Sequence, residues 1–248
     1  MKRFNSKTFF NENDKNKIET TIKGVEKKTS GEIVVMVVNE SEKYKEGEIF
    51  GASLLSLLFS LVIQFFIPDI LWNILNILKI SPQSFLNNLI KLPFQLKSEF
   101  RYLLMYGIWS FIPLAIILFI LFKFLISKIK LLKRVFLTDQ QIEYEVKEKA
   151  ITSFFEQGLY KTRDATGVLF LISLLEKKVY ILADKGIYEK IKQEKLDNLA
   201  FNISRGVKTD QATEALCKAI IECGEILEKY FPIKKDDINE LSNKVIIE

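Results

Sequence analysis

Residues 49–68 read IFGASLLSLLFSLVIQFFIP, a run that contains no charged side chain. A second uncharged run, YLLMYGIWSFIPLAIILFILF, covers residues 102–122. At a rise of about 1.5 Å per residue, each run is long enough to cross the roughly 30 Å hydrocarbon core of a bilayer as a helix. The sequence therefore predicts two transmembrane helices, at about 49–68 and 102–122.

Two crossings return the chain to the side of the membrane that it left, so the segments on either side of the hairpin can fold together in one aqueous compartment. We predict that residues 1–47 and 128–232 form one soluble domain, that residues 48–127 form the transmembrane hairpin, and that residues 233–248 are a flexible tail. Between the spans, residues 69–101 start with polar side chains at every third or fourth position among apolar ones. That pattern is typical of a helix lying in the membrane interface.

The two soluble parts have the pattern of an α/β domain. From Glu32 the chain reads EIVVMVVN, a β-branched run that suits a central strand buried on both faces. Residues 168–174 and 178–184 are apolar runs joined by a short polar turn, which predicts an antiparallel hairpin. Apolar residues at helical spacing predict helices at about 13–29, 138–158 and 210–230. The expected fold class is α/β, a small α/β/α sandwich interrupted by the two-helix transmembrane hairpin.

The composition excludes several classes of protein. The chain contains no histidine, which removes Ser-His-Asp triads, zincin motifs and histidine-dependent phosphatases. No glycine-rich phosphate loop is present, so we expect no nucleotide or organic cofactor. The net charge of +5 comes from lysines interleaved with acids, so we expect no nucleic-acid partner. Cys217 and Cys223 are six residues apart in a helical segment and do not share a face, which predicts two buried thiols in a reducing compartment.

The basic residues that flank the spans predict the orientation in the membrane. Met1 to Phe10 is polar and is not followed by an apolar run, so we expect no signal peptide, and the first span itself directs insertion. Basic residues next to the spans are more numerous on the domain side than in the loop between the spans. Those on the domain side are Lys43, Lys45, Lys123, Lys128, Lys130, Lys133 and Arg134, against Lys79, Lys91, Lys97 and Arg101 in the loop. We therefore expect an integral protein of a bacterial inner or plasma membrane, with its soluble domain in the cytoplasm.

Three carboxylates are candidates for a metal site. The antiparallel hairpin would bring Asp164 and Asp184 to one edge of the sheet, and a parallel first strand would add Glu32 to the same edge. Carboxylate, hydroxyl and carbonyl oxygens are the ligands of Ca²⁺ or Mg²⁺. A second interpretation needs no ligand, because acids commonly cap turns and end strands. Arg163 also has the option of an ion pair with Asp184 or Glu32, which would neutralise the site and weaken cation binding.

Four motifs occur in an order that resembles the TPM-domain family. They are Thr29-Ser30-Gly31-Glu32-Ile33 before the first strand, Thr162-Arg163-Asp164-Ala165-Thr166-Gly167-Val168-Leu169, Val179-Tyr180-Ile181-Leu182-Ala183-Asp184-Lys185-Gly186-Ile187, and Tyr230-Phe231-Pro232. That family includes YgcG-like bacterial proteins and thylakoid-lumen proteins linked to photosystem II repair. The resemblance covers about residues 13–44 and 137–232. Many relatives have an asparagine directly before the glycine of the second strand, where this chain has Thr166.

The resemblance implies an α/β/α sandwich, acid phosphatase activity in some plant members, divalent cation binding in others, and assembly or maintenance roles at membrane complexes. It carries the acidic sites over onto Asp164 and Asp184, with Glu32 a looser match. The catalytic residues remain unknown.

Three hypotheses for the function follow from the residues and the resemblance together. The first is a non-catalytic accessory factor that docks on membrane protein complexes, with the lipid bilayer and other membrane proteins as partners. The second is a metal-dependent acid phosphatase in which Asp164 and Asp184 hold the cation. The third is a calcium sensor in which cation binding near Asp164 alters docking.

Overall fold

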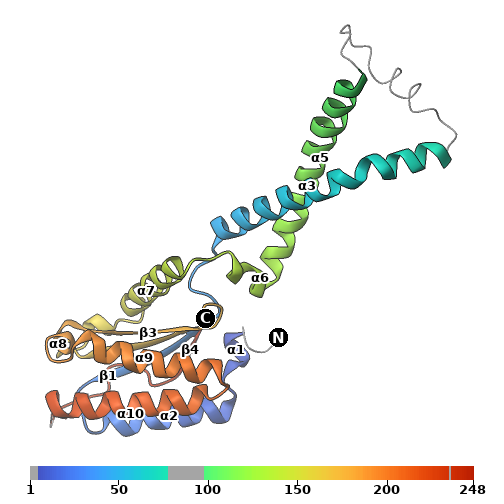
Figure 1. The fold of residues 1–248 in the computed structure, drawn as a ribbon. Coiled ribbons are helices and arrows are strands. Elements are labelled where there is room, and N and C mark those ends of the chain that lie inside the picture. The colour runs from blue at the N-terminus through green and yellow to red at the C-terminus, as the bar shows by residue number, and fades with distance from the viewer. Residues whose placement is uncertain (1–4, 78–97, 235) are drawn as a thin grey trace. The chain divides into compact units, whose positions relative to one another are not determined.

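The computed structural model describes residues 5–77, 98–234 and 236–248, and the chain divides into two compact units. The first, which we call the α/β unit, is Met1–Lys43 together with Leu137–Glu248. The second, the hairpin unit, is Tyr44–Phe136 and is inserted within the sequence of the first. Figure 1 shows the elements of both units.

The described part of the α/β unit contains a four-stranded sheet in the order β3-β2-β1-β4. The predicted first strand is β1, Glu32–Val38, which runs parallel to β2, Gly167–Ser173. The predicted antiparallel hairpin is formed by β2 with β3, Lys178–Ala183. Every residue of β1 and β2 is buried, which confirms that the continuous apolar runs are central strands covered on both faces.

Helices cover both faces of this sheet and make the unit an α/β/α sandwich (Figure 1). Val34, Met36 and Val38 of β1 pack in one buried cluster with the helix α7, Asp139–Glu156. The alternate residues of β1 pack on the opposite face in a second cluster. That cluster includes residues of α2, Glu12–Glu26, of α9, Gln193–Lys208, and of α10, Ala212–Tyr230.

Two predicted helix starts are explained by their caps. Asn11 and Asp14 form a capping box at the start of α2, and the Thr138 side chain accepts a hydrogen bond from the Gln141 backbone N–H at the start of α7. Three shorter elements complete the connections: α1, Ser6–Phe9, the 3₁₀ turn η2, Leu159–Lys161, and α8, Lys185–Tyr188.

The C-terminal segment, which we define as residues 236–248, is part of the sheet. Ile246–Ile247 form β4, which pairs in parallel with Met36 and Val37 of β1. The Glu248 N–H donates to the Val37 carbonyl at 3.0 Å, and the Lys149 ammonium lies 2.7 Å from the Glu248 carboxylate. The prediction of a flexible tail at 233–248 was therefore wrong for these residues. The segment is mostly polar, but it ends in a short β-branched stretch that covers the outer edge of β1.

The hairpin unit consists of long apolar helices. Its elements are α3, Lys45–Ile77, α5, Ser98–Lys128, and the short α6, Lys130–Val135. Two stretches, Lys45–Gln64 and Phe111–Lys128, are long and apolar enough to cross a membrane, with mean hydropathies of 1.6 and 2.2. In the described part of these helices, large apolar side chains are exposed, such as Ile117 at 63% and Phe124 at 60%. An exposed apolar surface on this scale indicates contact with lipid or protein rather than water.

α3 continues through Pro68 to Ile77. The helix therefore does not end at the predicted boundary between the first span and the interfacial helix. A proline inside a helix removes one hydrogen bond and is tolerated in apolar helices. Pro113 lies inside α5 in the same way. The rest of the predicted interfacial loop, residues 78–97, lies outside the described residues.

Small residues of α3 and an ion pair between α3 and α6 lie at the base of the hairpin unit. Ala52, Ser56 and Ser60 form a buried stripe at every fourth position of α3. Such a stripe allows the backbones of two helices to approach closely. Near the start of α3, the Glu48 carboxylate lies 3.3 Å from the buried Lys133 ammonium of α6.

Candidate functional site

The N-terminal ends of β1 and β2 define the edge at which the sequence predicts a metal site. Glu32 pairs with Gly167, and Val168 pairs with Ala183. The Asp184 N–H donates to the Gly167 carbonyl at 2.9 Å. The backbones of Glu32 and Asp184 are therefore at the same edge, as the predicted strand order requires.

Asp164 is engaged by a cation of the protein itself. Its two carboxylate oxygens lie 2.7 and 2.8 Å from the Lys234 ammonium. The neighbouring Arg163 guanidinium binds Asp236 at 3.0 Å and lies 3.7 Å from Asp237. Arg163 therefore pairs with the C-terminal segment, and the ion-pair option with Asp184 or Glu32 is not the one that the described residues form.

Glu32 points to the C-terminal segment as well. Its carboxylate accepts hydrogen bonds from the backbone N–H groups of Glu240 at 3.1 Å and Leu241 at 3.3 Å. The nearby Glu26, on α2, accepts from the Ile33 N–H at 3.0 Å and from the Asn243 amide. Glu26 and Glu32 together fasten residues 240–243 to the start of β1. We call this set of contacts the carboxylate latch.

Burial changes the acidity of both latch carboxyls. Loss of water raises the pKa of Glu26 to about 7, against the lowering effect of the Ile33 N–H, and the charge of Glu32 raises it further. Burial also raises the pKa of Glu32, while its two backbone donors oppose the shift. Below about pH 7, Glu26 therefore keeps a proton that an exposed glutamate would already have released.

Asp184 has a third set of neighbours. It caps α8, with Oδ1 accepting from the Lys185 N–H at 2.6 Å, whereas Oδ2 is buried and has no hydrogen-bond partner among the residues that the structure describes. Asp164, Asp184 and Glu32 thus share an edge of the sheet but bind different partners. In the described ranges, no three or more Asp, Glu, Cys or His side chains are grouped so as to hold a metal ion. A Ca²⁺ or Mg²⁺ ion at these residues stays a prediction.

Sequence reasoning missed Glu26, Lys234 and Asn243 as members of this edge. Lys234 and Asn243 belong to the part of the chain expected to be a tail, and their partners are far away in the sequence: Glu26 and Asn243 are 217 residues apart. No local pattern reports such a contact. The available signal was the apolar run Val245-Ile246-Ile247 near the end of the polar segment.

Two glycines of the TPM-like motifs sit where the backbone passes closely. A Cβ atom on Gly167 would lie 2.6 Å from the Leu159 carbonyl oxygen, and one on Gly186 would lie 2.7 Å from the Ala165 carbonyl oxygen. Both contacts are shorter than van der Waals distance and involve backbone atoms that cannot move aside easily. The glycines are therefore required by the packing of this edge, and they do not by themselves indicate a ligand.

A buried polar network lies at the C-terminal ends of β1 and β2. In the sequence, the part of it that follows β1 comes just before the hairpin unit. Glu176, in the β2–β3 turn, is fully buried and accepts a hydrogen bond from the Ser41 N–H at 2.9 Å. The Ser173 hydroxyl donates to the Glu176 carboxylate, and the Ser41 hydroxyl donates to that of Ser173 at 3.0 Å. The Leu175 N–H donates to the Asn39 carbonyl at 3.0 Å. The chain is thus held to the sheet until shortly before Tyr44, where the hairpin unit begins.

Comparison with known proteins supports the fold. No protein-family model and no curated protein sequence matches the chain. Among solved structures, the chain is similar to the NMR structure of BA42 protein from the psychrophilic bacterium Bizionia argentinensis. The two share 18% sequence identity with a TM-score of 0.52, over 97% of this chain and 96% of that one. At this identity the similarity shows a common fold, and the chain is therefore an α/β protein that carries an inserted apolar helical hairpin.

Proposed function

We propose that this chain is a membrane-anchored α/β domain that acts as a non-catalytic accessory factor in the assembly or maintenance of membrane protein complexes. The observation that carries the proposal is the position of the hairpin unit, which interrupts the α/β unit between β1 and α7. An anchor in this position ties the domain to the bilayer through two short connections. Such a domain presents its helices and sheet edge to neighbouring membrane proteins at high local concentration.

The network at Ser41 supports this role. On the outgoing side, the Ser41 N–H and the Asn39 carbonyl are hydrogen-bonded to the β2–β3 turn. On the return side, Leu137 packs on the cluster beneath α7 and Thr138 caps that helix. Both connections are therefore ordered parts of the α/β unit, which favours a docking module.

The contacts of the candidate metal site favour the accessory role over the metal-dependent phosphatase. A cation at Asp164 would have to displace the Lys234 ammonium, and one at Glu32 would compete with two backbone N–H donors. Calorimetry with Ca²⁺ and Mg²⁺ at millimolar concentration tests this directly. Heat of binding that is lost in Asp164→Asn, together with phosphate release lost in Asp184→Ala, would favour the enzyme.

We also propose that the chain is a TPM-domain protein, on the motifs that contain Gly31, Gly167 and Gly186. The observed sandwich and the similarity to BA42 protein agree with this assignment at the level of the fold. Divalent cation binding and membrane-complex maintenance are the family properties that the assignment would bring.

The orientation that we propose places the α/β unit in the cytoplasm of a bacterium. Both native cysteines are buried, so an engineered thiol gives a clean signal. Lys27→Cys adds an exposed thiol at the end of α2. A membrane-impermeant maleimide should label this variant only after the inner membrane is permeabilised. Labelling in cells with an intact inner membrane would place the domain on the other side.

The accessory role itself is tested by site-specific photo-crosslinking in cells. A photoreactive amino acid replaces Phe155 on α7 in one variant and Phe201 on α9 in another, since both side chains are more than half exposed. These positions lie on opposite faces of the sandwich. We expect one face to give a reproducible adduct with a specific membrane protein and the other face to serve as the control. If neither position yields an adduct with a membrane protein, the proposal is wrong.

A further inference from the structure

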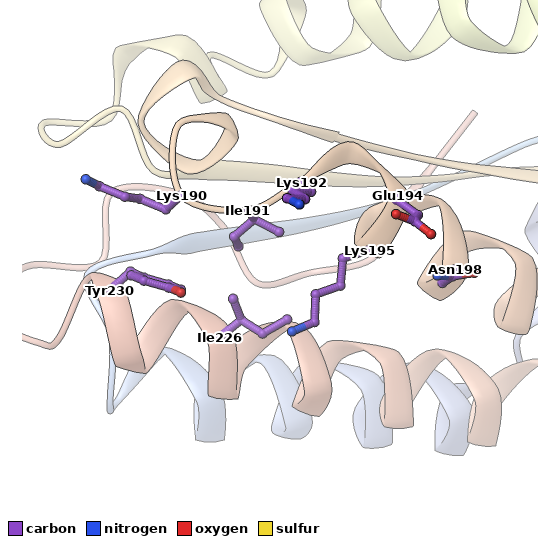
Figure 2. Close-up of a pocket in the computed structure, with 8 residues that line it drawn as sticks. All are labelled: Lys190, Ile191, Lys192, Glu194, Lys195, Asn198, Ile226 and Tyr230. Carbon is purple, nitrogen blue, oxygen red and sulfur yellow. The ribbon is translucent and has the colours of Figure 1, made fainter.

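A hollow of about 370 Å³ lies between the start of α9 and the end of α10, and Asp164, Asp184 and Glu32 are not among the residues that line it. Ile191 and Ile226 contribute apolar surface, and Tyr230 contributes a phenol ring. Lys192 and Lys195 stand at its rim, with a further lysine at position 190. Figure 2 shows Lys195 extending from α9 toward Ile226 and Tyr230 pointing into the hollow, whereas Lys190 extends outward.

The charges around this hollow are unbalanced. Lys190, Lys192 and Lys195 face a single acid, Glu194, and within the described residues none of the three lysines forms an ion pair. Elsewhere on the α/β unit, lysines such as Lys17 and Lys234 bind nearby carboxylates at 3.2 and 2.7 Å. The cluster is therefore a local concentration of unneutralised positive charge beside a concave surface.

The start of α9 adds to this potential. α9 begins at Gln193, and its N-cap residue Lys192 makes no side-chain capping hydrogen bond. The amide dipoles of a helix give its N-terminal turn a partial positive charge that attracts anions. The Lys195 N–H already donates to the Lys192 carbonyl at 3.0 Å, so the N–H groups that this turn can offer an anion are those of Gln193 and Glu194. Here the helix end and two lysine ammoniums attract an anion, and the concave apolar surface beside them offers space for an organic group.

From this arrangement we propose that the hollow binds a phosphate-bearing ligand whose organic part is apolar or planar. Lys192, Lys195 and the first turn of α9 bind the phosphate oxygens, and Ile191, Ile226 and the Tyr230 ring contact the organic part. A volume of about 370 Å³ exceeds that of a phosphate ion and falls in the range of small-molecule sites. The ligand is either a free phosphate ester or the headgroup of a phospholipid, which share this chemistry.

The phosphate-binding part and the apolar part of the proposed site can be tested separately with three compounds: phenyl phosphate, inorganic phosphate and phenol. Each is titrated into the full-length protein in neutral detergent, and protection of Lys192 and Lys195 from amine acylation is measured by mass spectrometry. Phenyl phosphate should protect both lysines at the lowest concentration, because it offers both the anion and the ring. Equal protection by inorganic phosphate would overturn the proposal of an organic moiety, and no protection would overturn the site.

Two variants distinguish this site from general attraction to lysines. Lys192→Gln with Lys195→Gln should weaken phenyl phosphate binding at least about tenfold, because it removes two charged donors to the phosphate. Lys218→Gln removes one charge from the exposed surface of α10 and should leave the affinity unchanged. All three lysines are exposed, so neither variant disturbs the core. Equal binding by the double variant and the wild type would overturn the proposal.

Nanodiscs distinguish the two sources of the ligand. The full-length protein is placed in phosphatidylcholine discs with or without phosphatidylglycerol, and the same lysine protection is measured. Protection that requires phosphatidylglycerol identifies a lipid headgroup as the ligand. Protection that requires added phenyl phosphate in both kinds of disc identifies a free ester. Absence of protection under every condition would contradict both sources.

Discussion

The α/β unit and the hairpin unit place their apolar side chains in opposite ways. In the α/β unit, Phe170 is completely buried and the strand residues around it are covered by helices on both faces. In the described part of the hairpin unit, side chains of the same type face outward, with Ile117 63% exposed and Phe124 60% exposed. Apolar side chains thus stabilise the α/β unit by packing in its interior, away from water. In the hairpin unit they form the outer surface, as an apolar environment requires.

The largest expected effect of a single substitution lies in the core of the α/β unit. Phe170→Ala removes a fully buried ring from the centre of β2 and should cost about 3–5 kcal/mol of unfolding free energy. Chemical denaturation followed by circular dichroism measures this loss. Membrane insertion of the hairpin unit should not change, because Phe170 is not part of it. Reduced insertion would show that the two units depend on each other.

A pair of arginine substitutions tests the difference in solvent directly. Ile117 and Phe201 are almost equally exposed, at 63% and 65%, but they lie in different units. Ile117→Arg should cost about 2.5–3.5 kcal/mol in a membrane-insertion assay, because it places a charge within an apolar span. Phe201→Arg should change the stability of the α/β unit by less than about 0.5 kcal/mol. Equal, small effects would mean that α5 does not contact lipid.

The carboxylate latch gives a smaller effect within the α/β unit. Glu32→Ala leaves the N–H groups of Glu240 and Leu241 without their acceptor and should cost about 1–3 kcal/mol. Hydrogen exchange at these two amides should accelerate, while exchange within β2 should be less affected. Glu225→Ala removes an exposed acid from α10 and is the matched control. Unchanged exchange at residues 240 and 241 would contradict the latch.

The pH dependence of stability is the smallest effect that we predict for a single step of the experiment, a change of one pH unit. The pKa of Glu26 is raised from 4.5 to about 7 in the folded protein, so the folded state binds more protons than the unfolded state between these values. The free energy of unfolding should therefore fall as pH rises from 4.5 to 7, by at most about 1.4 kcal/mol per pH unit for one proton. Glu26→Gln should reduce this slope. Glu32 contributes a slope of the same sign, so the variant should keep part of it.

The elements that the sequence predicted well depend on local patterns. The β-branched run at 32–38, the hairpin of β2 and β3 and the cap at Thr138 are each specified within a few residues. The strand order followed from the same patterns, because a helical crossover joins β1 to a parallel β2. These features brought Glu32 and Asp184 to one edge without any knowledge of distant contacts.

The partners of the site residues were not predictable in this way. β4 has two residues, and its pairing with Met36 and Val37 joins segments at opposite ends of the chain. A flexible tail at 233–248 has no fixed contacts, so that prediction excludes the observed partners of Glu32, Arg163 and Asp164. Their charges suggested a cation site, whereas Lys234 and the backbone of the C-terminal segment bind two of the three carboxylates. Side-chain pairing in this unit depends on the chain's last residues, which local periodicity does not place.

The insertion of the hairpin unit after β1 also dictates the order in which the protein is made. A ribosome completes β1 first, then the whole hairpin unit, and only then β2, the strand that pairs with all seven residues of β1. At about 5–20 residues per second, the first strand waits on the order of ten seconds for its neighbour. During that interval the EIVVMVV segment of β1 lacks the strand that pairs with it in the folded sheet. We therefore expect this nascent segment to be most prone to pairing with other chains before translation reaches Ser173.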